Sequence, residues 1–115
     1  EVAIVGWDGG RIDHTLAALG LAFDPRIKLI DDEFTVYCVN GEKTIEGEES
    51  TLFSLIAMPE ARVSVTGARW NLQHEKLNLG GRGIHNEIGP SGEVTIKCHS
   101  GNLLLIEGDF VLSHD

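Results

Sequence analysis

The residues whose types and spacing point most directly to chemistry are crowded into residues 9–16, which read G-G-R-I-D-H-T-L. Two glycines let backbone amides approach an anion closely, and the planar guanidinium of Arg11 matches the oxygens of a phosphate. A helix that begins here would add the favourable dipole of its N-terminus. Asp13 is suited to orienting Arg11 or binding Mg²⁺. The segment therefore predicts a phosphate or nucleotide site; in the alternative, Asp13 caps the helix and the glycines form a turn.

A second candidate segment spans residues 65–72, V-T-G-A-R-W-N-L, where a predicted strand ends at a glycine and presents Trp70. The electron-rich face of an indole stacks on flat heteroaromatic rings and on cations. Trp70 therefore predicts a surface for an aromatic or cationic ligand. The alternative is that Trp70 closes one end of a β core.

A third candidate segment, residues 80–87, reads G-G-R-G-I-H-N-E and places His85, Asn86 and Glu87 together. The carboxamide of Asn86 offers both a donor and an acceptor, as the edge of a heterocycle requires. A solvated connection between two strands is the alternative interpretation of the same residues.

The elements that must position these segments begin with an apolar strand over residues 2–7 and a helix over 16–23, which Asp24-Pro25 ends. A strand followed by a helix is half of a parallel β-α-β unit, and no upstream strand in the chain completes it. We therefore expect residues 1–25 to be the remnant of an α/β domain in a larger protein.

Residues 26–115 predict a second, all-β domain. Short β-branched and aromatic runs recur every eight to twelve residues, which is typical of a sandwich or barrel. Asn40-Gly41 predicts a tight hairpin between strands 34–39 and 44–46, and residues 99–102 predict another between strands 93–98 and 103–106. The predicted fold is therefore mainly β: a jelly-roll-like β-sandwich preceded by one strand and one helix.

Composition limits the partners. The chain has 115 residues, enough for one core, and its 9 Lys and Arg against 18 Asp and Glu give a formal charge of −9. We expect no nucleic-acid partner, because such binding depends on clustered cations. No run is long enough to span a membrane and no signal peptide begins the chain, so we expect a cytoplasmic protein.

The cysteines and histidines predict no metal centre. The five histidines lack zinc-site spacing, so we assign no metal ligand. Cys38 and Cys98 each lie in an apolar run, which indicates buried free thiols, with a disulfide between strands as the alternative.

Taken in order, the three segments resemble the C-terminal part of thiamin pyrophosphokinases. That family has a strand leading into G-G-R-x-D-H-x-L, then a β-sandwich with G-x-x-[WY]-x-L, matched at 67–72, and G-x-S-N-E, matched at 83–87. His85 stands where the family usually has Ser. The resemblance implies transfer of a pyrophosphoryl group from ATP to thiamin with Mg²⁺, in a homodimer whose site lies between the α/β domain of one subunit and the sandwich of the other.

The resemblance also implies roles for single residues. Arg11 and Asp13 would be catalytic, and Gly10, Arg11 and His14 would contact the nucleotide. Trp70 would stack on thiamin, with His85 and Asn86 at its polar edge.

The family's acidic motifs, of the types G-D-x-D-S and K-D-x-T-D, do not occur in these 115 residues. Metal-assisted phosphoryl transfer depends on such carboxylates, so we expect the chain alone to be inactive. The alternative function is a non-enzymatic β-sandwich module for binding or oligomerisation. A different enzyme with an acid-base site at Arg11, Asp13 and His14 is disfavoured because no nucleophile accompanies them.

Overall fold

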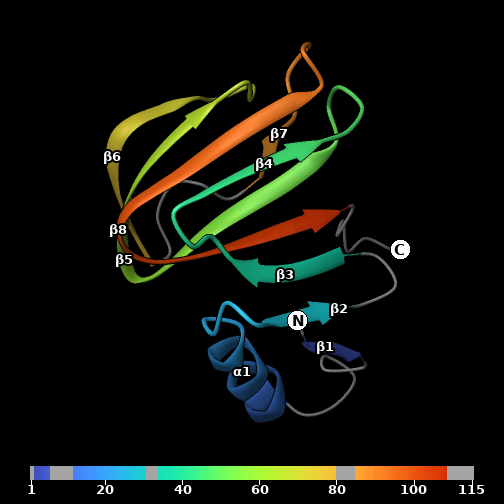
Figure 1. Ribbon diagram of the computed structural model, residues 1–115, viewed down its shortest axis with the longest axis vertical. Helices are drawn as coiled ribbons and strands as arrows, with labels where there is room; N and C mark the ends of the chain where they lie inside the picture. The colour runs from blue at the N-terminus through green and yellow to red at the C-terminus, as the bar shows by residue number, and fades with distance from the viewer. Residues whose placement is uncertain (1, 6–11, 31–33, 80–84, 109–115) are drawn as a thin grey trace.

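A computed structural model of the chain describes residues 2–5, 12–30, 34–79 and 85–108. These residues form one helix and eight strands of a mixed sheet, as expected for a mainly β fold (Figure 1). In chain order the elements are β1 (Val2–Val5), α1 (Ile12–Leu21), β2 (Ile27–Ile30), β3 (Phe34–Cys38), β4 (Glu42–Glu46), β5 (Leu52–Thr66), β6 (Leu72–Asn78), β7 (Asn86–Glu87) and β8 (Glu93–Gly108).

The long strands β5 and β8 form the centre of the sheet and run through both layers of a sandwich. They pair antiparallel along most of their length, with register shifts between Ala57 and Ala61 and between Arg62 and Val63. Such irregularities bend a strand and increase its twist. The first half of β5 and the second half of β8 therefore lie in one layer, and their other halves lie in the second layer.

The remaining strands attach to one half or the other. In the first layer β3 pairs with the second half of β8, β2 with β3, and β7 with the start of β5. In the second layer β4 pairs with the first half of β8 and β6 with the second half of β5. Apolar side chains from both halves of β5 and β8, among them Phe53, Leu55, Val63, Ile96 and Leu105, share one buried core. The predicted β-sandwich is thus confirmed.

Both predicted hairpins are wrong, for one reason. Residues 99–102 do not reverse the chain but lie within β8, which continues to Gly108. Likewise, β3 and β4 do not pair with each other across Asn40-Gly41, because each pairs with a different half of β8. A glycine between two predicted strands indicates a residue with positive φ. Positive φ occurs in hairpin turns, but it also occurs where a strand bends from one layer into the other, so the glycine alone does not distinguish the two.

The β-α-β unit is complete within the chain, which also differs from expectation. β2 pairs in parallel with β1, from Val2 opposite Ile27 to Val5 opposite Ile30, and antiparallel with β3 on its other side. The completing strand lies downstream of the helix, among residues that the sequence assigned to the all-β part. The division at residue 25 therefore remains a prediction, while β2 joins the two parts in one sheet.

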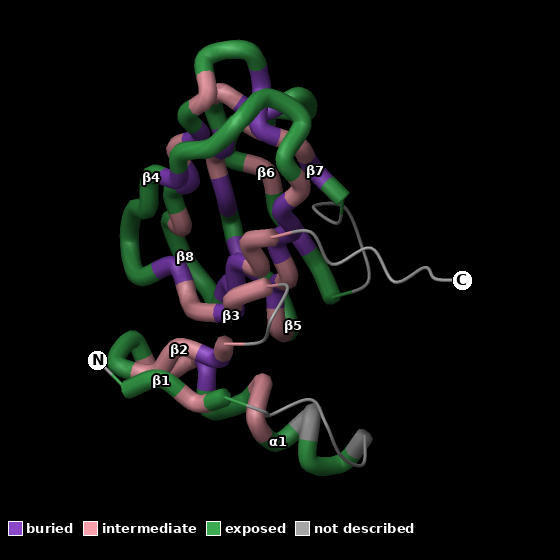
Figure 2. Tube along the Cα trace, turned by 90° about the vertical axis from the view of Figure 1, so that its right-hand side faces the viewer, coloured by how far each residue is buried: buried purple, intermediate pink, exposed green. Residues whose placement is uncertain are grey.

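The centre of the first layer is buried on both faces, which explains the uninterrupted apolar run in β8. Leu103, Leu104 and Leu105 are successive residues of β8 and are each at most 1% exposed. Leu103 and Leu105 face the sandwich core, whereas Leu104 packs with Leu29 in a second cluster. Ala18 and Leu19 of α1 pack against that cluster, so the helix covers the outer face of this layer near β1 and β2 (Figure 2).

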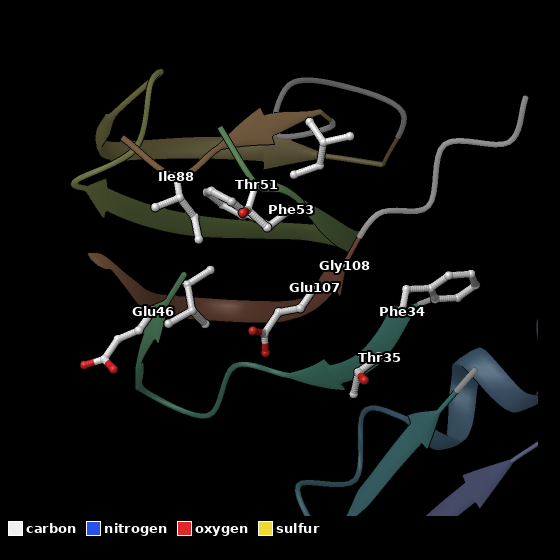
Figure 3. A pocket seen from close by; sticks show the side chains of 10 residues that line it. Phe34, Thr35, Glu46, Thr51, Phe53, Ile88, Glu107 and Gly108 are labelled. Atoms are coloured by element: carbon white, nitrogen blue, oxygen red, sulfur yellow. The ribbon is translucent and has the colours of Figure 1, made fainter. Parts of the chain in front are cut away.

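One end of the sandwich holds a cavity of about 310 Å³ where β4 ends, β5 begins and β8 ends (Figure 3). Buried Phe53 and Ile88 form part of its apolar wall, and Glu46 and Glu107 bring carboxylates to it. The carboxylate of Glu107 accepts a hydrogen bond from the Tyr37 hydroxyl. Burial, and then this carboxylate, raise the pKa of Tyr37, so the phenol remains a donor.

The bend in β8 depends on Gly101, whose φ is +87°. A Cβ at this position would overlap the backbone of β5 at Glu60 and lie 2.7 Å from the Cα of Ala61. Only glycine fits both the backbone conformation and the close approach of the two strands.

Gly101→Ala should therefore be more destabilising than Gly41→Ala, which is a matched control with the same φ of +87° and open space around it. The control measures the cost of an L residue at positive φ, about 1–2 kcal/mol. The clash should add about 1–3 kcal/mol to the loss at Gly101. Urea unfolding measures both, and equal losses would show that the contact of Gly101 with β5 is unimportant.

Candidate functional site

The segments that carry Trp70 and Asn86 lie side by side, with residues 67–71 running against residues 85–89. The Gly89 amide donates to the Gly67 carbonyl (2.9 Å), Ala68 forms a bridge with Ile88, and the Arg69 amide donates to the Glu87 carbonyl (2.9 Å). The first of these segments follows the end of β5, and the second includes β7, which pairs with the start of β5. The two motifs that the sequence singled out in this domain therefore form one structural unit.

The carboxamide of Asn86 extends this unit to Trp70. Its Oδ1 accepts hydrogen bonds from the Trp70 amide (3.2 Å) and the Glu87 amide (2.8 Å), and its Nδ2 donates to the Trp70 carbonyl (2.8 Å). Asn86 is 5% exposed, so these bonds form away from solvent. The side chain thus takes the place of a peptide group in an antiparallel pair and fixes the backbone of Trp70.

The indole of Trp70 remains accessible while its backbone is held. Trp70 as a whole residue is 52% exposed, in contrast to a residue that closes a core. The guanidinium of Arg69 lies over the ring, with Cζ 4.5 Å from the ring centroid, and Arg69 Nη1 lies 3.5 Å from Glu87 Oε1. The site therefore offers an aromatic surface with a paired cation on it.

His85 lies next to Asn86 at the start of the same segment. Its φ is +64°, and its amide donates to the hydroxyl of Ser54 (2.9 Å), which is 1% exposed. The backbone of His85 is thus anchored to β5 while the residue itself is exposed. The structure places His85 next to the Asn86–Trp70 pair, and their common role in ligand binding remains a prediction.

The N-terminal candidates are placed elsewhere. Gly10 and Arg11 lie outside the described residues. Asp13 and His14 are exposed on the first turn of α1, where the Asp13 carboxylate accepts the His14 amide (2.9 Å). Since α1 lies beside β1 and β2 at one end of the first layer and β7 forms the opposite edge of that layer (Figures 1 and 2), Asp13 and His14 are separate from the Trp70 unit.

A histidine pair that the sequence did not predict lies on the outer face of the second layer. The rings of His74 and His99 are stacked, 3.8 Å apart and 11° from parallel. Ser64 links them, since its Oγ accepts the His74 amide (3.0 Å) and bonds Nε2 of His99 (2.8 Å). All three line a cavity of about 720 Å³. Desolvation, and then the charges of His74 and Lys97, lower the pKa of His99. The three residues come from different strands, so no sequence spacing signals the pair.

The cysteines are free and partly buried, in agreement with the interpretation as thiols. Burial raises the pKa of both Cys38 and Cys98, which keeps the thiols protonated and unreactive at neutral pH.

No three His, Cys, Asp or Glu side chains gather to hold a metal ion anywhere in the described ranges. The described helix is also too short to cross a bilayer.

Asn86→Asp should destabilise the domain, because an isosteric carboxylate keeps the acceptor but faces the Trp70 carbonyl without a proton. We expect a loss of about 1–3 kcal/mol in the free energy of unfolding. Asn71→Asp is the matched control: Asn71 is exposed and uses only its Oδ1, to accept the Ala68 amide (2.9 Å). Denaturant unfolding should show a larger loss of unfolding free energy for Asn86→Asp than for Asn71→Asp. Equal losses would contradict the role of the Asn86 donor.

Comparison with known proteins shows which family has this architecture. Residues 42–103, more than half of the chain, match the family model described as thiamin pyrophosphokinase, vitamin B1 binding domain. Thiamine pyrophosphokinase 2 of Oryza sativa subsp. japonica is 27% identical over 91% of this chain and 43% of its own length. Thiamine pyrophosphokinase 1 of the same plant is 28% identical over 70% of this chain and 34% of its own.

Solved structures of proteins with the same fold lead to the same family. Thiamine pyrophosphokinase from Bacillus subtilis superposes with a TM-score of 0.81 at 27% identity, over 92% of this chain and 54% of that one. Thiamin pyrophosphokinase from Candida albicans shares the fold at 14% identity, with a TM-score of 0.76 over 93% of this chain and 44% of that one. The chain thus spans about a third to just over half the length of these relatives. It belongs to the thiamin pyrophosphokinase family and contains the family's vitamin B1-binding domain.

Proposed function

We propose that the protein of which this chain is part transfers a pyrophosphoryl group from ATP to the hydroxyl of thiamin, and that the β-sandwich supplies the thiamin site. The observation that carries the proposal is the indole of Trp70, a residue that is 52% exposed and whose backbone is held by the buried Asn86 carboxamide. A fixed, accessible aromatic face is what stacking on the flat rings of thiamin requires. The alternative, a non-enzymatic sandwich module, is not favoured by the family match.

Within this proposal Asn86 acts by holding Trp70, because its carboxamide already bonds the Trp70 and Glu87 backbone. Exposed His85, beside it, is the residue that we assign to the polar edge of thiamin in place of the family's Ser. Trp70 supplies the stacking surface and excludes water from one side of the ligand.

We assign the nucleotide side of the reaction to Gly10, Arg11, Asp13 and His14, at the N-terminus of α1. Mg²⁺ would neutralise the phosphate charges of ATP when bound. Among the described residues, no cluster of three potential metal ligands occurs. We propose that the acidic motifs of the family, which do not occur in these 115 residues, hold the metal.

The helix α1, which carries Asp13 and His14, lies beside β1 and β2 at one end of the first layer, and β7 forms the opposite edge, so the two sets of residues do not meet within one subunit. We propose that a second copy of the protein completes the site, so that the enzyme is a homodimer. We further propose a cytoplasmic location.

Trp70→Ala in the full-length protein should weaken thiamin binding by about 1 kcal/mol, or roughly fivefold, which is the contribution of one aromatic stacking pair. Trp70→Phe keeps a smaller aromatic face and should retain most of the affinity. Isothermal titration calorimetry measures both variants. Unchanged affinity in Trp70→Ala would rule out stacking on this indole.

The 115-residue chain alone should form no thiamin diphosphate from thiamin, ATP and Mg²⁺, whereas the full-length protein should form it. The reason is that the acidic metal-binding motifs of the family are absent from this sequence. Chromatographic assay of thiamin diphosphate tests both samples. Mg²⁺-dependent product from the short chain would overturn the assignment of the metal site, and none from the full-length protein would overturn the proposed reaction.

A further inference from the structure

The orientation of the Trp70 ring depends on a neighbour whose side chain has no part in the motif match. Arg69 and Trp70 are consecutive, and consecutive side chains of an extended strand point to opposite faces. Here the chain bends after β5, and the Arg69 guanidinium lies 4.5 Å from the centroid of the indole. One face of the ring is therefore covered by a planar cation.

Arg69 is in turn tied to Glu87 at two points. Its amide donates to the Glu87 carbonyl (2.9 Å), and its Nη1 lies 3.5 Å from Glu87 Oε1. The arginine side chain is 61% exposed and the glutamate side chain 22% exposed. An isolated surface pair of this kind adds little to stability. The Arg69–Glu87 pair matters for another reason. Because the Arg69 guanidinium lies against the indole, the pair determines which face of Trp70 is open.

We propose that Arg69 and Glu87 are positioning residues that hold the indole of Trp70 with one face covered and the opposite face presented to thiamin. This inference rests on the proposed function. The cation–π contact limits rotation of the ring, so less conformational entropy is lost when the ligand stacks.

The charge of Glu87 has a second role in the same arrangement. Thiamin carries a permanent positive charge on its thiazolium ring, and an unpaired guanidinium behind the indole would repel it. Glu87 compensates that guanidinium, so the covered face presents no net charge to a cationic ligand. The pair thus orients the ring without opposing the ligand.

A double-mutant cycle in the full-length protein tests the inference, with thiamin as the probe and calorimetry as the measurement. Arg69→Gln should weaken binding roughly two- to fivefold, the strength of an exposed cation–π contact. In the Trp70→Ala background the same substitution should have no further effect, because the ring that it positions is gone. Lys76→Gln, which removes a cation from the exposed Lys76–Glu60 pair (3.1 Å), is the matched control and should leave binding unchanged.

Two further measurements separate positioning from a general structural effect. In a background in which every other tryptophan of the full-length protein, Trp7 included, is replaced by Phe, Arg69→Gln should lower the fluorescence anisotropy of Trp70 while the unfolding midpoint stays constant. Glu87→Gln should weaken thiamin binding most at low ionic strength, with partial recovery as salt screens the exposed guanidinium.

The outcomes distinguish this inference from the function on which it rests. If Trp70→Ala weakens binding and Arg69→Gln does not, or if Arg69→Gln weakens binding equally in both backgrounds, the positioning role is wrong and the proposed function stands. If Trp70→Ala itself leaves thiamin binding unchanged, the stacking site is wrong.

Discussion

The shared ladder of β5 and β8 is the constraint on which the rest of the structure depends. Both strands bend at the same level, where the register shift between Ala57 and Ala61 of β5 meets the positive φ of Gly101 in β8. The coordinated bend turns a two-stranded ribbon back on itself, so that its two halves bury the same apolar face. Every other strand completes one half, and the helix covers the outer face of the first layer near β1 and β2.

The Trp70 unit is a direct product of that bend. A straight strand as long as β5, which has 15 residues, would hold its two ends about 45 Å apart. In this fold β7 pairs with Leu52 and Phe53 at the start of β5, and the segment around β7 also contacts the loop that follows Thr66 at its end. The site therefore lies where both ends of one strand are joined through a third segment. The buried carboxamide of Asn86 makes the last of those connections.

The sequence predicted the local elements better than the topology. Apolar alternation indicated the strands, and the Trp70 and Asn86 segments, which the sequence singles out, lie side by side, while their function as a site remains a prediction. The signals at Asn40-Gly41 and around Gly101 predict hairpins, but a positive φ does not specify whether the chain reverses or crosses between layers. The stacked His74 and His99, and the guanidinium of Arg69 on the indole, arise from contacts between side chains. Neither spacing nor composition encodes those contacts.

Continuous central strands also limit how this domain can move. In a sandwich made of two separate sheets, the layers can slide or open along the apolar seam between them. Here β5 and β8 cross that seam as unbroken backbone, so an opening of the layers would require breaking the ladder that builds them both. Within the described part of the chain, closure around a ligand is therefore left to the loops at the strand ends, or to a rigid-body approach of another folded unit toward this one.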